Sequence, residues 1–392
     1  MVRSVLIALL MAIPAFAAAQ DIKIGVLGDL AGPFAAMSGK GSIAAAELAV
    51  EDMKGSVLGR KIQILTGDSQ NKADVGAAVV KRWFEAEGVS MVTDNWGSAV
   101  GLAVQAEARR MNRIALFSGA GTADLTGKEC STSGFVWTFD TTTQARALAK
   151  TLVGQGLDTW YFLTPDFIFG TQMEQTAGDV VRSLGGKILG SSKFPLTNTD
   201  FSSFLLAAQA SKAKVIVING GDVASAMKQA GEFGILAGGQ KFAASILYLP
   251  YVKGIGTKLG QGTYVTNSFY WDMNERTREW SKRYYARVGS MPSMNHAGTY
   301  SSTLHYLRAV QKAGTTDTNA VVAAMRSMPV EDATAKGTLR ADGRLVRDYF
   351  MWQVKAPAES QGEWDLLKLV RQIPAAEIVP SLAESNCPLV SR

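Results

Sequence analysis

The sequence predicts an α/β protein made of two doubly wound lobes, each a parallel sheet with helices on both faces. Three observations support this prediction. Short β-type runs alternate with amphipathic helical runs from Ile22 onward, and this alternation is typical of parallel sheets. The alternation starts again after residue 140, and 392 residues are more than one hydrophobic core usually holds.

The first series of elements runs from residue 22 to residue 119. Its strand segments are short apolar runs such as "IKIGVL", whereas helical segments such as "SIAAAELAVEDMK" repeat apolar residues at helical spacing. Strands are expected at 22–27, 61–68, 90–95 and 113–119, and helices at 42–54, 73–88 and 98–111.

The second series follows the segment "FVWTFD" at 135–140. It has helical segments at 143–156, 170–185, 200–211 and 222–235, and β-type runs at 159–166, 186–195, 214–220 and 241–246. Later helices at 276–289, 297–314 and 318–328 are expected to return to the first lobe. The segment 337–354 predicts two antiparallel strands around an "ADG" turn.

These elements predict that the chain crosses between the lobes near residues 140, 268 and 346. Lobe 1 is then 21–140 plus 269–345. Lobe 2 is 141–268 plus 346–392, with the C-terminal tail returning to lobe 1.

Residues 1–20 have the pattern of a signal peptide. Arg3 gives a basic start, an apolar run follows, and the small residues of "AFAAAQ" suit cleavage. The run is too short for a stable membrane anchor, and it has no cysteine at its end to carry a lipid. We therefore expect an exported chain without stable membrane insertion, whose mature form begins near Gln20 or Asp21.

Charge and cysteine content bear on the partners of the protein and on its disulfide bonding. The net charge is +6 with no block of Lys or Arg, so a nucleic-acid partner is not expected. Cys130 and Cys387 lack C-x-x-C spacing, and two cysteines in an oxidising compartment can form one disulfide. The prediction is a bridge that holds the C-terminal tail, and a free thiol is the alternative.

The loops that follow the strands of the first lobe are the candidate site. In open α/β sheets, ligands bind beyond the carboxyl ends of the strands, next to helix N-termini. The loops at 28–41, 94–101 and 118–127 are rich in Gly, Ser and Thr. They offer N–H groups and hydroxyls that suit an anion such as a carboxylate.

Motifs for other chemistry are missing. "GAGTAD" has Asp124 where a dinucleotide-binding loop needs its third glycine, and the chain has neither a P-loop nor a G-x-S-x-G motif. His296 and His305 are nine residues apart, which fits no metal pair. His296 is the one histidine considered as a ligand contact. We expect no metal, no cofactor and no catalysis.

Aromatic residues gather at or beside the expected strand ends. Each alone is typical of core packing, but together around a cleft they would form the largely apolar cage of a small-molecule site. They are Phe34, Trp96, Phe167, Phe169, Tyr248, Tyr270 and Trp271.

Several long segments resemble a known family. They are "IKIGVLGDLAGPFAAMSGKGSIAAAELAVEDM", "VTDNWGSAVGLAV", "LFSGAGTADLTG" and "FVWTFDTTTQA". These are similar to the periplasmic solute-binding proteins of the Leu/Ile/Val-binding type, which are receptors of ABC importers in Gram-negative bacteria. The resemblance covers the mature chain and extends to members that bind aromatic carboxylates, in which the cysteine pair also occurs. It implies the type I periplasmic-binding fold, with a multi-strand hinge, a ligand cleft between the lobes and a periplasmic location.

The resemblance also implies a ligand site. N–H groups and hydroxyls of Ser98, Ala99 and the loop Ala120–Thr122 would hold the ligand carboxylate. Phe169 matches a tyrosine that lies over the ligand in the family, and Asp222 matches a contact from the second lobe. The complete candidate set is Phe34, Trp96, Gly97, Ser98, Ala99, Ala120, Gly121, Thr122, Phe167, Phe169, Asp222, Leu247, Tyr248, Tyr270 and His296.

One departure from the family bears on the ligand. Amino-acid binders place a glutamate after the strand that matches 241–246, where it pairs with the ligand ammonium, but here "ASILYLPY" has no acid. A buried ammonium without a counter-charge is costly. The sequence therefore favours a benzoate- or hydroxycinnamate-like carboxylate, unless Asp222 replaces the missing acid.

The expected function is capture of this carboxylate by hinge closure and its delivery to the membrane subunits of an importer, by a monomeric receptor. The alternatives are a branched-chain or other aliphatic amino-acid binder, a ligand-sensing module and an exported α/β enzyme.

Overall fold

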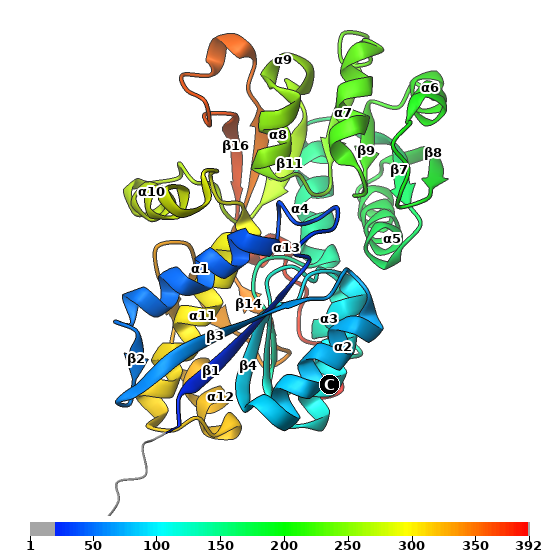
Figure 1. The fold of residues 1–392 in the computed structure, drawn as a ribbon. Coiled ribbons are helices and arrows are strands. Elements are labelled where there is room, and N and C mark those ends of the chain that lie inside the picture. Colours follow the sequence, from blue (N-terminus) through cyan, green and yellow to red (C-terminus); the bar gives the residue numbers. More distant parts are fainter. Residues whose placement is uncertain (1–19, 391–392) are drawn as a thin grey trace, which may run out of the picture.

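The computed structural model describes residues 20–390, so nearly all of the predicted signal peptide lies outside the described residues. Two α/β lobes lie one above the other, each built on its own sheet (Figure 1). The predicted two-lobe α/β fold is confirmed.

The sheet of lobe 1 has the order β2-β3-β1-β4-β5-β6. β2 is antiparallel to β3, and the other neighbours are parallel. Because the chain turns from one side of β1 to the other between β3 and β4, the carboxyl end of β1 is the topological switch point. The strands are β1 (Ile22–Gly28), β2 (Ser56–Val57), β3 (Arg60–Asp68), β4 (Val89–Asp94), β5 (Ile114–Phe117) and β6 (Gly134–Val136).

Helices cover both faces of this sheet because its strands are apolar at successive positions. Ile24 and Leu116 pack in the cluster that contains residues of α11 and α12, whereas Leu27 and Phe117 pack with residues of α2 and α3. The helices of lobe 1 are α1 (Gly39–Asp52), α2 (Ala73–Arg82), η1 (Trp83–Glu87), α3 (Ser98–Arg110), η2 (Ala123–Thr126), α10 (Glu275–Val288), α11 (Met294–Ala313) and α12 (Thr318–Ser327).

The sheet of lobe 2 has the order β16-β15-β11-β10-β9-β7-β8, and β15 and β16 are antiparallel additions at its edge. One face packs on α4 and α5, and the other packs on α6, α7 and α8. Its strands are β7 (Thr159–Pro165), β8 (Lys187–Phe194), β9 (Val215–Ile218), β10 (Lys241–Ala244), β11 (Tyr264–Asn267), β15 (Tyr349–Val354) and β16 (Leu367–Ile373). Its helices are α4 (Thr141–Gly154), α5 (Ile168–Ser183), α6 (Ser202–Ala210), α7 (Val223–Glu232), α8 (Leu249–Ile255), α9 (Thr257–Gly260), η3 (Pro357–Glu359) and α13 (Ala375–Ile378).

The prediction of two strands in 337–354 is partly wrong. A hairpin does form around the "ADG" turn, between β13 (Lys336–Leu339) and β14 (Leu345–Val346), and β12 (Val330–Glu331) adds to it. The chain then leaves lobe 1, and β15 pairs with the sheet of lobe 2 instead of continuing the hairpin. Residues 345–354 therefore contribute strands to two sheets, with Arg347 and Asp348 between them.

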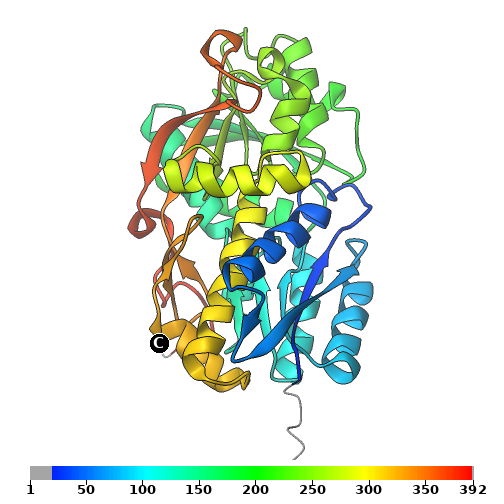
Figure 2. The same ribbon diagram turned by 60° about the vertical axis from the view of Figure 1, so that its left-hand side comes forward.

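Within residues 20–390, three segments connect the lobes before the C-terminal tail returns, and hydrogen bonds join these three to one another. Arg347, between β14 and β15, donates to the carbonyl oxygens of Ser268 (2.7 Å) and Thr334 (3.1 Å). The Tyr349 hydroxyl donates to the carbonyl oxygen of Thr138, at 2.7 Å. Figure 2 shows α10 lying across the level at which the lobes meet.

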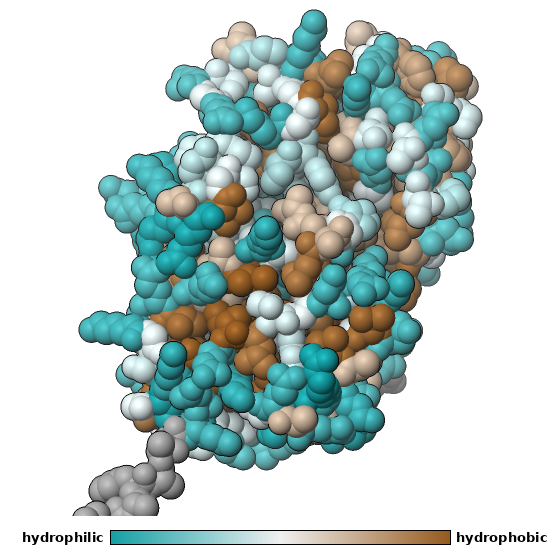
Figure 3. Space-filling model, in the orientation of Figure 1, coloured by the Kyte–Doolittle hydropathy of each residue, from teal (hydrophilic) through white to brown (hydrophobic). Residues whose placement is uncertain are grey.

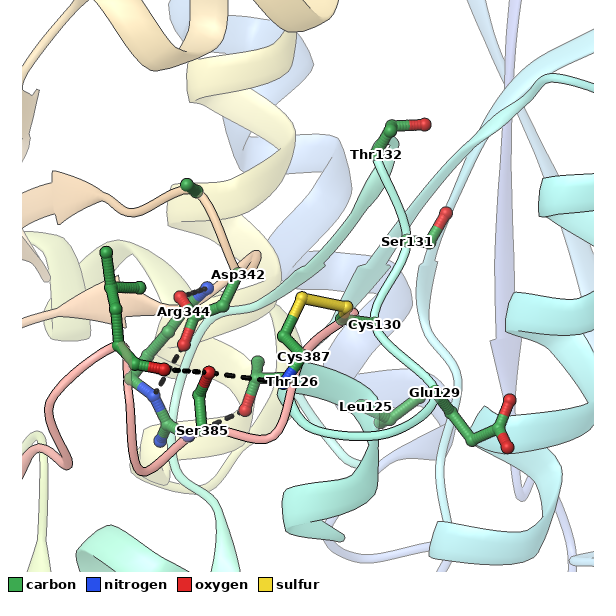
Figure 4. Close-up of a disulfide and its surroundings, with 12 residues drawn as sticks. Leu125, Thr126, Glu129, Cys130, Ser131, Thr132, Asp342, Arg344, Ser385 and Cys387 are labelled. Carbon is green, nitrogen blue, oxygen red and sulfur yellow. Dashed lines mark hydrogen bonds and ion pairs between the residues drawn. A yellow bond between two sulfur atoms is a disulfide. The ribbon is translucent and has the colours of Figure 1, made fainter. Parts of the chain in front are cut away.

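The C-terminal tail leaves lobe 2 after β16 and α13 and returns to lobe 1. Cys387 forms a disulfide with Cys130, 257 residues earlier in the chain, so the predicted bridge is confirmed and the free-thiol alternative is wrong (Figure 4). Next to it the Arg344 guanidinium donates to the Thr126 hydroxyl at 2.6 Å. The tail is therefore held against the segment that follows β5.

Figure 3 shows hydrophobic residues in brown across the middle of the face drawn in Figure 1, with hydrophilic residues over much of the rest. In residues 20–390, no helix combines the length and the apolar character needed to cross a membrane.

Candidate ligand-binding site

A cavity of about 310 Å³ lies between the lobes. It is reached by segments beyond the carboxyl ends of β1, β3, β4, β5 and β6 from lobe 1 and of β7, β8, β9 and β10 from lobe 2, which is where open α/β sheets bind ligands. The lining residues are Phe34, Met37, Asn71, Trp96, Gly97, Ser98, Ala99, Gly119, Gly121, Phe139, Phe167, Ile168, Phe169, Leu196, Gly220, Gly221, Val223, Ile246, Tyr248 and Tyr251.

Aromatic rings form two rows in the walls of this cavity. In the first row, the ring centroids of Phe34 and Trp96 are 5.6 Å apart and those of Trp96 and Tyr248 are 5.8 Å apart. In the second row, Phe139 meets Phe169 edge-on at 6.0 Å, and Phe169 lies 6.1 Å from Phe167. Both rows include rings from each lobe, and such spacings are typical of favourable aromatic contacts.

Helices α3 and α5 begin at the cavity wall without a capping side chain. Helix α3 starts at Ser98 after Gly97, and α5 starts at Ile168 after Phe167. The first N–H groups of a helix have no partner within the helix, and they carry a partial positive charge. Ser98 and Ala99 from lobe 1 and Ile168 and Phe169 from lobe 2 therefore bring hydrogen-bond donors to the cavity without any ionised side chain.

Gly97 is required at the start of α3. Its φ is +93°, in the left-handed region that favours glycine. The turn connects β4 to α3 within three residues and brings Trp96 and Ser98 to the same cavity.

None of the described residues that line the cavity is an Asp, Glu, Lys, Arg or His. Asp94 Oδ1 lies 3.0 Å from the position that a Cβ on the lining residue Gly119 would occupy. Asp94 is fully buried, however, and accepts hydrogen bonds from the Ser38 hydroxyl and from Asn295 Nδ2 (3.1 Å). Burial raises the pKa of this carboxyl to about 6, and the Ser38 and Asn295 hydrogen bonds only partly oppose that shift.

Nine of the fifteen candidate ligand residues line the cavity. They are Phe34, Trp96, Gly97, Ser98, Ala99, Gly121, Phe167, Phe169 and Tyr248.

The other six lie outside the lining, each with another environment. Two of them are committed to local hydrogen bonds. The Asp222 carboxylate caps α7, since it accepts from the Ser225 N–H (3.0 Å) and the Ser225 hydroxyl (2.6 Å). Thr122 is fully buried, and its hydroxyl accepts from the Asp124 N–H at 3.3 Å.

The remaining four are packed in the interior. The Tyr270 hydroxyl donates to the Trp364 carbonyl oxygen at 3.0 Å. His296 stacks on Tyr284 with 5.2 Å between the ring centroids, and burial lowers its pKa to about 3. Ala120 and Leu247 are buried in separate hydrophobic clusters.

Several lining residues were not among the candidates. Asn71 follows the carboxyl end of β3 and Leu196 follows β8, so the rule that ligands lie beyond strand ends would have found both had it been applied to every strand. Tyr251 lies in α8, a short helix that was not predicted, although Pro250 in its first turn is a helix-start signal. The others are Met37, Gly119, Phe139, Ile168, Gly220, Gly221, Val223 and Ile246.

Comparison with known proteins places this geometry in context. A family model described as a periplasmic binding protein matches residues 21–362. The chain is 37% identical to a periplasmic binding protein from Burkholderia mallei, with a TM-score of 0.90 over 95% of this chain and 99% of that one. It is 36% identical to a branched chain amino acid ABC transporter periplasmic ligand-binding protein from Burkholderia xenovorans, with a TM-score of 0.87 over 94% and 100%.

A more distant structure shares the fold. It is a solute binding protein of an ABC transporter from Rhodopseudomonas palustris in complex with 3,4-dihydroxybenzoic acid, 20% identical, with a TM-score of 0.83 over 91% of this chain and 98% of that one. No curated protein matches the chain.

Proposed function

The chain belongs to the family of leucine/isoleucine/valine-binding-type periplasmic binding proteins, and from that premise we propose that it is the receptor of an ABC importer for a small aromatic carboxylate. Members of this family are ligand-binding receptors in the periplasm that act with the permeases of ABC transporters, and they are not enzymes. The ligand class, the delivery to a permease and the export through residues 1–20 are the proposal.

The combination of aromatic walls and uncharged hydrogen-bond donors supports this ligand class. A flat ring can pack between the row that contains Trp96 and the row that contains Phe169. Its carboxylate can then accept from the N–H groups of Ser98 and Ala99 at the start of α3. Since that carboxylate needs no counter-ion, a cavity without ionised side chains suits it.

An amino acid is the second candidate, because the Burkholderia xenovorans relative is described as a branched chain amino acid transporter protein. Its ammonium would need an acceptor with a negative charge. Asp94 and Asp222 adjoin lining residues, but neither lines the cavity: Asp94 is fully buried and accepts from Ser38 and Asn295, and Asp222 caps α7. We therefore favour the aromatic carboxylate over the amino acid.

Thermal unfolding with a ligand panel tests the proposal. The panel holds benzoate, 4-hydroxybenzoate, 4-hydroxycinnamate, leucine and succinate, with benzamide as an uncharged match for benzoate. A ligand at about 100 times its Kd stabilises the fold by about 2.7 kcal/mol, a shift of several degrees. We expect a shift with aromatic acids and none with benzamide. A shift with leucine alone would show that the ligand is an amino acid and that the proposed ligand class is wrong. Equal shifts with benzoate and benzamide would show that the N–H groups at the start of α3 do not bind the ligand carboxylate.

A further inference from the structure

The Gln172 side chain of lobe 2 reaches the loop after β5 in lobe 1, to which the Thr141 hydroxyl at the start of α4 also bonds by accepting from the Ala123 N–H (3.2 Å). Gln172 lies in the second turn of α5 and is half-buried. Its Oε1 accepts hydrogen bonds from the hydroxyls of Thr122 (2.9 Å) and Thr141 (3.1 Å). Its Nε2 donates to Asp124 Oδ2, at 3.2 Å.

The partners determine which way the amide faces. A carboxylate only accepts hydrogen bonds, so the NH₂ end must face Asp124, and the carbonyl end then faces the two hydroxyls. An amide satisfies this arrangement in full. Asp124 Oδ2 also lies 3.3 Å from Nζ of Lys128, whose side chain is exposed. A glutamate would place a second negative charge against Asp124, and a leucine would leave both hydroxyls without this partner and Asp124 with Lys128 alone.

The hydrogen bonds to Thr122 and Asp124 join the two walls of the ligand cavity, whereas the bond from Thr141 lies within lobe 2. Gln172 follows Ile168 and Phe169 by about one helical turn, and both of these line the cavity. Thr122 directly follows Gly121, which lines the cavity from the other lobe. On the opposite rim, the only comparable bond given by the described residues is from the Tyr251 hydroxyl to the Pro33 carbonyl oxygen, and at 3.4 Å it is long.

We propose that Gln172 is a positioning residue for ligand capture: its amide joins α5 to the 122–124 segment in the closed receptor and so slows ligand release. The inference rests on the proposed function, since it assumes that a ligand is captured by closure of the lobes. Gln172 acts through the two walls and needs no contact with the ligand. It should therefore affect the dissociation rate more than the association rate, because the encounter takes place before the lobes are joined.

The test compares Gln172→Leu with Gln175→Leu, a matched change at an exposed position of the same helix. Stopped-flow fluorescence gives the two rates with whichever ligand of the panel binds the wild type. We expect Gln172→Leu to raise the dissociation rate about 10-fold, the scale of one or two lost net hydrogen bonds, and to change the association rate less than about 2-fold. Gln175→Leu should match the wild type. Equal dissociation rates in all three proteins would overturn the inference.

Gln172→Glu separates the hydrogen bonds from packing. At pH 7.5 its carboxylate faces Asp124 and release should be at least as fast as in Gln172→Leu. Near pH 4.5 a growing fraction of the glutamate is protonated and regains a donor, so the ratio of its dissociation rate to the wild-type rate at the same pH should fall. For Gln172→Leu this ratio should be the same at both pH values. Glutamate and leucine variants with the same pH dependence would count against the inference.

Failure of the inference is distinguishable from failure of the proposed function. If no panel ligand binds the wild type, the ligand class is wrong, and hydrogen exchange of the ligand-free protein still tests Gln172. Gln172→Leu should then speed exchange in 122–126 and in the first turns of α5, whereas Gln175→Leu should not. Unchanged exchange in both segments would overturn the inference without reference to any ligand.

Discussion

Asp94 shows how an acid can lie next to a ligand cavity without giving it charge. Asp94 is the last residue of β4, two residues before Trp96, and it is fully buried and does not line the cavity. Ser38 and Asn295 supply its hydrogen bonds, so the buried group is solvated by protein instead of water. The sequence could not reveal this, because an Asp at a strand end is typical of a ligand contact as well.

The raised pKa of Asp94 predicts a pH-dependent stability. Between its ordinary value of 3.8 and about 6, the folded state holds more protons at Asp94 than the unfolded chain does. The carboxyl therefore destabilises the fold as the pH rises through this window, and lowering the pH from 7 to 5 should recover about 1 kcal/mol. We expect the free energy of unfolding of the wild type to rise by that amount relative to Asp94→Asn.

Urea denaturation of both proteins at pH 7 and pH 5 measures this difference. The comparison with Asp94→Asn is needed because His296, whose pKa is lowered to about 3, acts in the opposite direction: its stabilisation is lost as the pH falls below the ordinary value of 6.5. A difference between wild type and variant that is the same at both pH values would contradict the prediction.

Asp222 and Thr122 mark the limit of prediction at single residues. Sequence reasoning found the loops in which they lie, and their neighbours Gly221, Val223 and Gly121 do line the cavity. The side chains themselves turn to the backbone or to a partner residue: Asp222 to α7, and Thr122 to the Asp124 N–H and Gln172. The direction of such a side chain depends on the exact positions of its neighbours, which a pattern of residue types does not specify.

At the scale of elements, the alternation of strands and helices was enough to predict the doubly wound lobes. β1, β3, β4 and β5 and the helices between them appear where the apolar runs indicated. The strands at the edge of the lobe 2 sheet were harder to predict from the sequence. In β16 only the end residues Leu367 and Ile373 are buried and Leu369 is exposed, so the strand has no regular burial pattern that a sequence would show.

The start of α3 can be tested by removing one N–H group while keeping the helix. Proline is tolerated at the first position of a helix, so Ser98→Pro should leave stability within about 1 kcal/mol and delete one donor at the cavity. We expect the Kd for a carboxylate ligand to rise about 10-fold or more. Ser98→Ala keeps the N–H and should bind within about 3-fold of the wild type, the residual reflecting only the lost hydroxyl.

Isothermal titration calorimetry gives both dissociation constants, and circular dichroism checks the fold of each variant. Equal affinities of the proline and alanine variants would show that the α3 terminus does not hold the ligand.

At the scale of the whole molecule, the disulfide fixes the C-terminal tail to lobe 1, in addition to the three segments that connect the lobes. It closes 257 residues, and loop entropy sets an upper figure of about 5 kcal/mol for its stabilisation. The double variant Cys130→Ser with Cys387→Ser should therefore unfold several degrees below the wild type in calorimetry. Wild type with a reductant present should approach the variant. An unchanged melting temperature in both would mean that the tail stays in place without the bond.

Both ends of the described chain belong to lobe 1. β1 begins there at Ile22, and the tail is fixed there at Cys387 (Figure 1). A molecule attached to a surface by either end is therefore held through lobe 1, and lobe 2 can move relative to that surface. For a fluorescent biosensor, reporters fused to the two ends would travel together and register no closure. One dye must be placed on lobe 2, for example at Leu206 of α6, whose side chain is exposed.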